Sequence, residues 1–70
     1  MDYETFTAYL LLHDYERNRS NNWIKDRVTI NIDHFMSKII VTCPIKPRGF
    51  NSVVKEFNTP EEVIKFLDGL

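Results

Sequence analysis

The sequence predicts a small α+β domain of two layers, in which a helix, a three-stranded antiparallel sheet and a second helix follow one another (α-β-β-β-α). Two runs within residues 28–45 alternate between apolar and polar side chains, with the period of strands that bury one face. Residues 59–70 begin with helix-capping signals and continue with an apolar stripe at helical spacing. A chain of 70 residues is long enough for one hydrophobic core, so residues 1–70 are predicted to form a single domain.

The first helix is expected to run from Asp2 to about Glu16, because Asp2 can cap it and Glu4 suits the positive end of its dipole. The competing interpretation is a strand, because Tyr and Thr, which favour strands, recur through the segment. As a helix the segment is apolar on two sides and needs two partners, the sheet and either another protein or a second copy of the chain in a homodimer. The two sides carry Phe6, Tyr9, Leu10 and His13, and Ala8, Leu11, Leu12 and Tyr15.

Residues 17–22 are expected to form a polar loop because their Asn and Ser side chains favour turns, and residues 23–27 would lead into the first strand. The two alternating runs that follow predict a β-hairpin whose register is fixed, because a one-residue slip would turn the apolar side chains to solvent. Its link, residues 34–37, contains Phe35 and Met36 where a turn is normally polar. They either pack under a helix or form an exposed apolar tip, and packing is favoured because small domains bury most large apolar groups. The inward residues of the two strands are Val28, Ile30 and Ile32, and Ile39, Val41, Cys43 and Ile45.

Residues 46–51 are expected to form a loop with a type I turn, and residues 52–57 a third strand at the edge of the sheet. The final helix is predicted from Thr59 as N-cap, Pro60 at its first position and Glu62 as the partner of a capping box, and Gly69 would end it. Its apolar stripe consists of Val63, Phe66, Leu67 and Leu70. If both helices cover the apolar face of the sheet, the other face is solvated and carries Arg27, Thr29, Asn31, Lys38, Thr42 and Glu56.

Composition limits the classes of function that can be expected of this chain. The net charge of −1 argues against a protein that binds nucleic acid over its whole surface. Cys43 is the single cysteine, so no disulfide can form within the chain, which fits a reducing compartment. The first residues lack the pattern of a signal peptide and no apolar run is long enough to span a membrane, so a cytoplasmic protein without membrane contact is expected. A richness in Ile, Asn and Lys is consistent with a bacterial, phage or mobile-element origin.

No catalytic or metal-binding motif is found. The His, Asp and Cys residues show no zinc spacing, the pair Glu61 and Glu62 fits a helix start, and two glycines are too few for a phosphate-binding loop. The expectation is therefore a protein that is not an enzyme and has no cofactor or metal.

The remaining candidate functional residues are basic and aromatic. We expect a small interaction protein, a regulator or inhibitor that acts by occupying the surface of a larger protein, because Arg and Trp are common anchors of interfaces. The alternative is that Arg17, Arg19 and Lys25 are solvated and Trp23 belongs to the core. The candidate partner-binding residues are Arg17, Arg19, Trp23, Arg27, Phe35 and Met36.

The alternative function is a nucleic-acid-binding module. The predicted order of elements is similar to the double-stranded-RNA-binding domain, and that resemblance implies RNA binding through basic residues at the start of the final helix. Residues 58–62 of this chain are acidic at that position, so no functional residue is carried over. The candidate nucleic-acid-binding residues are instead Arg17, Arg19, Lys25, Lys46 and Arg48.

Overall fold

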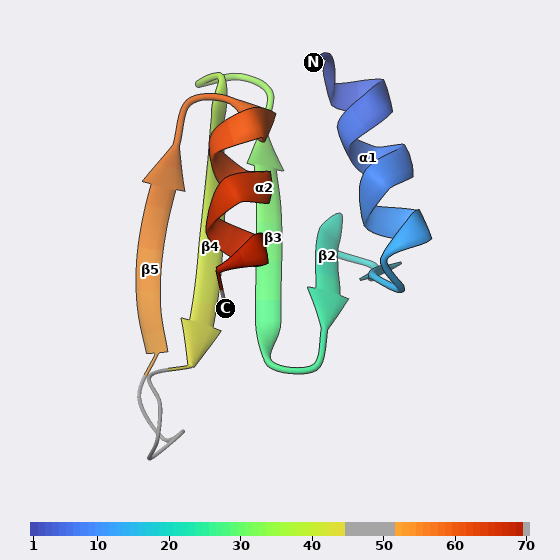
Figure 1. Cartoon of the computed structure of the whole chain (residues 1–70), viewed down its shortest axis with the longest axis vertical. Coiled ribbons are helices and arrows are strands. Elements are labelled where there is room, and N and C mark those ends of the chain that lie inside the picture. The colour runs from blue at the N-terminus through green and yellow to red at the C-terminus, as the bar shows by residue number, and fades with distance from the viewer. Residues whose placement is uncertain (45–51, 70) are drawn as a thin grey trace.

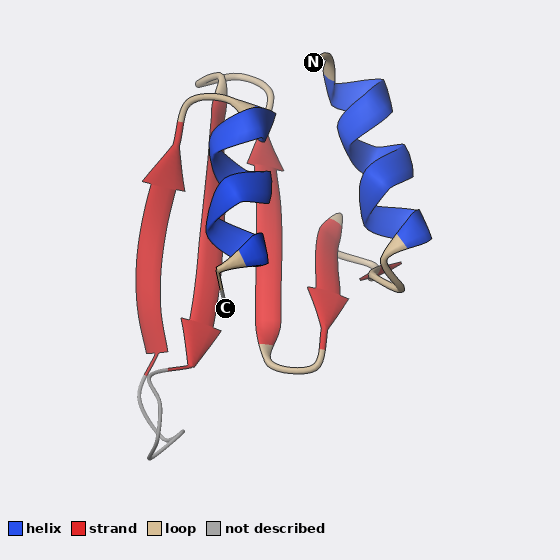
Figure 2. Ribbon diagram, in the orientation of Figure 1, coloured by secondary structure: helices blue, strands red, loops and turns tan. Residues whose placement is uncertain are grey.

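The computed structural model describes residues 1–44 and 52–69, and it confirms an α+β fold with two helices (Figures 1 and 2). The sheet has five strands in this part of the chain, where the sequence predicted three. The predicted α-β-β-β-α order is therefore wrong in detail, since two further strands precede the hairpin. The elements are α1 (Tyr3–Leu12), β1 (Glu16–Arg17), β2 (Asn22–Lys25), β3 (Val28–Asp33), β4 (Lys38–Pro44), β5 (Ser52–Phe57) and α2 (Pro60–Asp68).

The strands form a meander. Their order in the sheet is β1-β2-β3-β4-β5, and each is antiparallel to its neighbour. The predicted hairpin is confirmed as β3 and β4, with Ile30 opposite Val41 and Ile32 opposite Ile39. The predicted third strand is confirmed as β5, at the edge of the sheet. The expected loop at residues 46–51 lies outside the described residues.

The sequence pattern did not predict β1 and β2, because these strands are short and their turns contain no glycine. Residues 17–22 were expected to be a loop, yet Arg17 pairs with Trp23 across the first two strands. Asp14, Asn21 and Asp26 take the positive φ values of these connections, 69°, 63° and 54°. Asn and Asp tolerate this left-handed region better than other side chains, so they replace glycine here.

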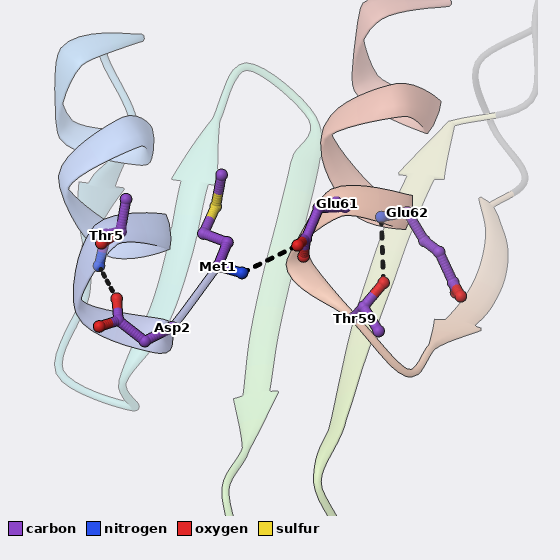
Figure 3. Close-up of polar contacts among 6 residues, drawn as sticks. All are labelled: Met1, Asp2, Thr5, Thr59, Glu61 and Glu62. Carbon is purple, nitrogen blue, oxygen red and sulfur yellow. Dashed lines mark hydrogen bonds and ion pairs between the residues drawn. The ribbon is translucent and has the colours of Figure 1, made fainter.

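Both helices begin at the residues that the capping signals predicted. The Asp2 carboxylate accepts a hydrogen bond from the Thr5 amide at 2.8 Å, which rules out the strand alternative for this segment, although α1 ends at Leu12 rather than near Glu16. The Thr59 hydroxyl accepts from the Glu62 amide at 3.3 Å at the start of α2 (Figure 3). The Glu62 carboxylate accepts from the backbone amide of Asn58 at 3.4 Å, one residue before the N-cap.

The core lies between the sheet and the two helices. Trp23, Ile30 and Val41 are cross-strand neighbours on β2, β3 and β4, so they point to the same face of the sheet. α1 and α2 close this face, and Figure 1 shows α2 lying in front of the central strands. The buried core residues are Phe6, Leu10, Tyr15, Trp23, Ile30, Ile39, Val41 and Val63.

The opposite face of the sheet is open, as expected. Thr29 pairs with Thr42, and Asn31 with Ile40, at positions that alternate with the buried ones. The polar side chains of this face contact one another: Asn31 Nδ2 donates to Asn22 Oδ1 at 2.6 Å, and Lys38 Nζ lies 3.5 Å from Glu56 Oε2. Arg27, which was expected on this face, lies in the turn between β2 and β3.

Candidate interaction surface

The connection between β3 and β4 is an exposed apolar tip. The side chains of Phe35 and Met36 are 94% and 55% exposed, so the expectation that they pack under a helix is wrong. The reason lies in the connection itself, where His34 rather than Phe35 packs against α1. The ring of His34 meets the ring of Tyr3 edge-on, with 4.8 Å between centroids.

The backbone of the tip is held by local hydrogen bonds. Asp33 Oδ1 accepts from the amides of Phe35 and Met36, both at 3.1 Å. Ser37 then takes a positive φ of 55° and returns the chain into β4. Because the amides are bonded inside the turn, the two apolar side chains point outward on a fixed backbone.

Trp23 belongs to the core and not to a partner surface. Its side chain is 7% exposed, in a cluster with Ile30 and Val41. This finding corrects its place among the candidate partner-binding residues. The cause is its position on β2, which puts it on the helix-covered face of the sheet.

The candidate arginines are exposed and lie on β1 and in two turns of the sheet. Arg17 lies on the edge strand β1, where its Nε and Nη2 donate to Asn21 Oδ1 at 3.0 and 2.6 Å. Arg19 lies in the turn between β1 and β2, and Arg27 in the turn between β2 and β3. Arg27 and the tip stand at opposite ends of β3, on the order of 20 Å apart at the usual rise of a strand (Figure 1). Arg27 and the tip therefore lie at different ends of the sheet, and partner binding by Arg17 and Arg19 stays a prediction.

The described candidate nucleic-acid-binding residues, Arg17, Arg19 and Lys25, lie on β1, the turn after it and β2. The ammonium group of Lys25 lies 5.6 Å from the centroid of the Tyr15 ring, beside the core. Acidic residues stand next to the basic ones, with Glu16 before Arg17 and Asp26 before Arg27. Lys46 and Arg48 lie outside the described residues.

Two exposed leucines mark a second apolar feature at the far end of α1. Leu11 and Leu12 are 61% and 83% exposed, whereas Leu10 is fully buried. The leucine run was the sequence signal for this second apolar side of the helix. The homodimer expected from it stays a prediction, which sedimentation at several concentrations would test. Sequence reasoning gave no sign that Met1 and Val54 would also be exposed, at 51% and 60%.

An ion pair lies at the end of the molecule that carries the tip. The amino group of Met1 lies 2.8 Å from Glu61 Oε2 and joins the start of α1 to the first turn of α2 (Figure 3). The hydrogen bond from this amino group lowers the pKa of the Glu61 carboxyl. The Thr5 side chain and amide similarly lower the pKa of Asp2.

Within residues 1–44 and 52–69, no group of three or more His, Cys, Asp and Glu side chains could hold a metal ion. Neither helix of this described part has the length and apolar character needed to cross a membrane. Comparison of the chain with protein-family models, curated proteins and solved structures yields no match. The candidate site therefore rests on the geometry of this chain alone.

Proposed function

We propose that the chain is a small, non-enzymatic interaction protein, a regulator or inhibitor that docks on a larger protein through the tip Phe35 and Met36. The observation that carries the proposal is the 94% exposure of Phe35 on a turn whose backbone is held by Asp33. Burying one such side chain at an interface is worth about 1.5–3 kcal/mol. A fixed turn also loses little conformational freedom when it binds, which favours affinity.

The tip makes no contribution to the core that would otherwise explain two large apolar side chains in a turn. Phe35 and Met36 are absent from the buried cluster and from the partly buried residues packed against it. Single exposed apolar residues are common on protein surfaces, but here two are adjacent on one projecting turn. A projection of this kind fits a concave site on a partner.

The test is affinity capture with the tagged chain from a lysate of the cells that express it, with nuclease present and at two salt concentrations. The double variant Phe35→Ala with Met36→Ala should lose a stoichiometric protein partner that the unmodified chain retains. Its stability should change by less than about 0.5 kcal/mol, because both side chains are on the surface.

The matched control is Leu11→Ala with Leu12→Ala, which removes two similarly exposed apolar side chains from α1. Its oligomeric state is compared with that of the unmodified chain by sedimentation, because the homodimer is expected to form through these leucines. Capture by this control should match that of the unmodified chain. Equal loss in both variants would show nonspecific apolar adhesion and would contradict the proposal. Recovery of nucleic acid that disappears at high salt would instead favour the alternative function, because phosphate contacts release counterions.

A further inference from the structure

We infer that the partner of the tip is a protein surface with an apolar pocket rimmed by Lys and Arg side chains. This inference rests on the proposed function and adds the chemistry of the partner. The observation behind it is the charge of the residues that surround Phe35 and Met36, which differs from that of the rest of the chain. We call this end of the molecule the apex, defined as residues 1–4, 33–38, 56 and 59–62.

Four segments meet at the apex. The tip joins β3 to β4, and the edge-on contact of Tyr3 with His34 brings the first turn of α1 beside it. Glu56, near the end of β5, lies 3.5 Å from Lys38 at the start of β4. The first turn of α2 follows β5 and is joined to Met1 through Glu61 at 2.8 Å. Figure 1 shows the N-terminus, the turn between β3 and β4 and the start of α2 at the same end of the molecule.

The apex is acidic although the whole chain is nearly neutral. The net charge is −1, from ten Asp and Glu against nine Lys and Arg. Six of those ten acidic residues belong to the apex, and Lys38 is the only Lys or Arg among its residues. Both apical cations, Lys38 and the amino group of Met1, are already paired with carboxylates of the apex. The acidic residues are Asp2, Glu4, Asp33, Glu56, Glu61 and Glu62.

The other described cations lie outside the apex. Arg17 and Arg19 are on β1 and the turn after it, Lys25 is on β2 beside Tyr15, Lys65 is in the last turn of α2, and Arg27 lies at the far end of β3 from the tip. Lys55 is next to Glu56 in sequence but on the opposite face of the sheet, with its ammonium 5.4 Å from the centroid of the Phe66 ring. None of these cations belongs to the apex, so its six acidic residues outnumber its two paired cations and its net charge is negative.

Charge complementarity then indicates what kind of partner the tip binds. An acidic apex repels nucleic acid and anionic lipid, and it attracts a surface that carries Lys and Arg. Phe35 supplies the apolar anchor, and the carboxylates around it supply a polar rim, which is the usual arrangement of an interface centre and its border. A basic protein surface with an apolar pocket is complementary to both features.

The experiment selects peptides from a random displayed library on the immobilised chain and then measures the affinity of the enriched peptides. One variant removes apical charge with side chains of nearly the same size: Glu4→Gln with Glu56→Gln and Glu61→Gln. Its unfolding is compared with that of the unmodified chain, because Glu56 and Glu61 form the ion pairs with Lys38 and Met1. The matched control removes the same charge elsewhere: Asp14→Asn with Glu16→Gln and Asp26→Asn. Asn is suited to the positive φ of Asp14 and Asp26. A second probe is the tip variant Phe35→Ala with Met36→Ala.

Enriched peptides should combine Lys or Arg with apolar residues and should no longer bind the tip variant. The apical charge variant should bind them roughly 3- to 30-fold more weakly at low salt, while the control should differ by less than about twofold. High salt should narrow the difference, because exposed charges are screened.

Two results would overturn the inference, and they are distinguishable. Neutral or acidic peptides that need Phe35 but ignore the apical charge variant would contradict the basic partner and leave the proposed function standing. A selection without any peptide that depends on the tip would contradict both.

Discussion

Tyr15 is the residue whose ionisation should most affect the stability of the fold. It follows α1, its amide donates to the Leu10 carbonyl at 3.0 Å, and its ring is buried in the core. Burial raises the pKa of the Tyr15 hydroxyl, and the nearby Tyr9 and Asp26 raise it further. A group whose pKa is raised on folding stabilises the folded state below the unfolded pKa, and this contribution is lost as pH rises through the folded pKa.

The variant Tyr15→Phe should therefore resist alkali better than the unmodified chain. Urea unfolding at about pH 8 and about pH 11, on either side of the ordinary tyrosine pKa of about 10, would measure the effect. The unmodified chain should lose more stability between the two pH values than the variant does. Burial also raises the pKa of Tyr9, so the variant should still lose part of its stability between the two pH values. A difference between the two proteins that does not change with pH would contradict this reasoning.

At the same scale, Trp23 and Phe35 show what sequence could and could not predict about the site. Both are large aromatics, but Trp23 lies on a strand, opposite Ile30 on the covered face, whereas Phe35 lies in a turn. That register depends on β2, which the sequence pattern did not reveal. The tip was located correctly by its position between two alternating runs, but its exposure depends on His34 taking the place beside Tyr3, a tertiary contact.

Among the elements, α2 is the one most clearly specified by local signals. The hydroxyl of its N-cap Thr59 accepts a hydrogen bond from the Glu62 amide at 3.3 Å. Val63, the next residue, is fully buried. The variant Thr59→Ala should lower the free energy of unfolding by about 0.5–2 kcal/mol, because the amide loses its partner. Thermal or urea unfolding measures this loss. The variant Thr59→Ser keeps the hydroxyl and should lose less, and an equal loss in both would assign the effect to the methyl group.

The elements differ in how well local sequence predicts them for a physical reason. β3, β4 and β5 are six or seven residues long, so their alternation is visible, and α2 has a cap at its start. β1 and β2 are two and four residues long, too short to show a period. Their existence depends on turns at Asp14, Asn21 and Asp26, where positive φ occurs without glycine. Pairing with β3 rather than intrinsic preference makes these segments strands.

For the whole molecule, the meander determines how the chain can fold. Every strand of the described sheet pairs with the strand next to it in sequence, so each pairing closes a short loop. Ile30 lies near the centre of this arrangement, between Trp23 on β2 and Val41 on β4. Packing of α2 on the core, by contrast, brings Val63 into one buried cluster with Phe6 and Leu10, which come from the other end of the chain. Local pairing should therefore precede the docking of the helices.

This order can be tested by kinetics with Trp23, the single tryptophan, as the fluorescent probe. Folding should be single-exponential and on the order of milliseconds, as for mixed domains rich in local contacts. The variant Ile30→Val should cost about 0.5–1.5 kcal/mol and mainly slow folding, because its contacts form early. The variant Val63→Ala should mainly accelerate unfolding, since its contacts form after the transition state. The reverse assignment, with Val63→Ala slowing folding, would place the docking of α2 before the completion of the sheet.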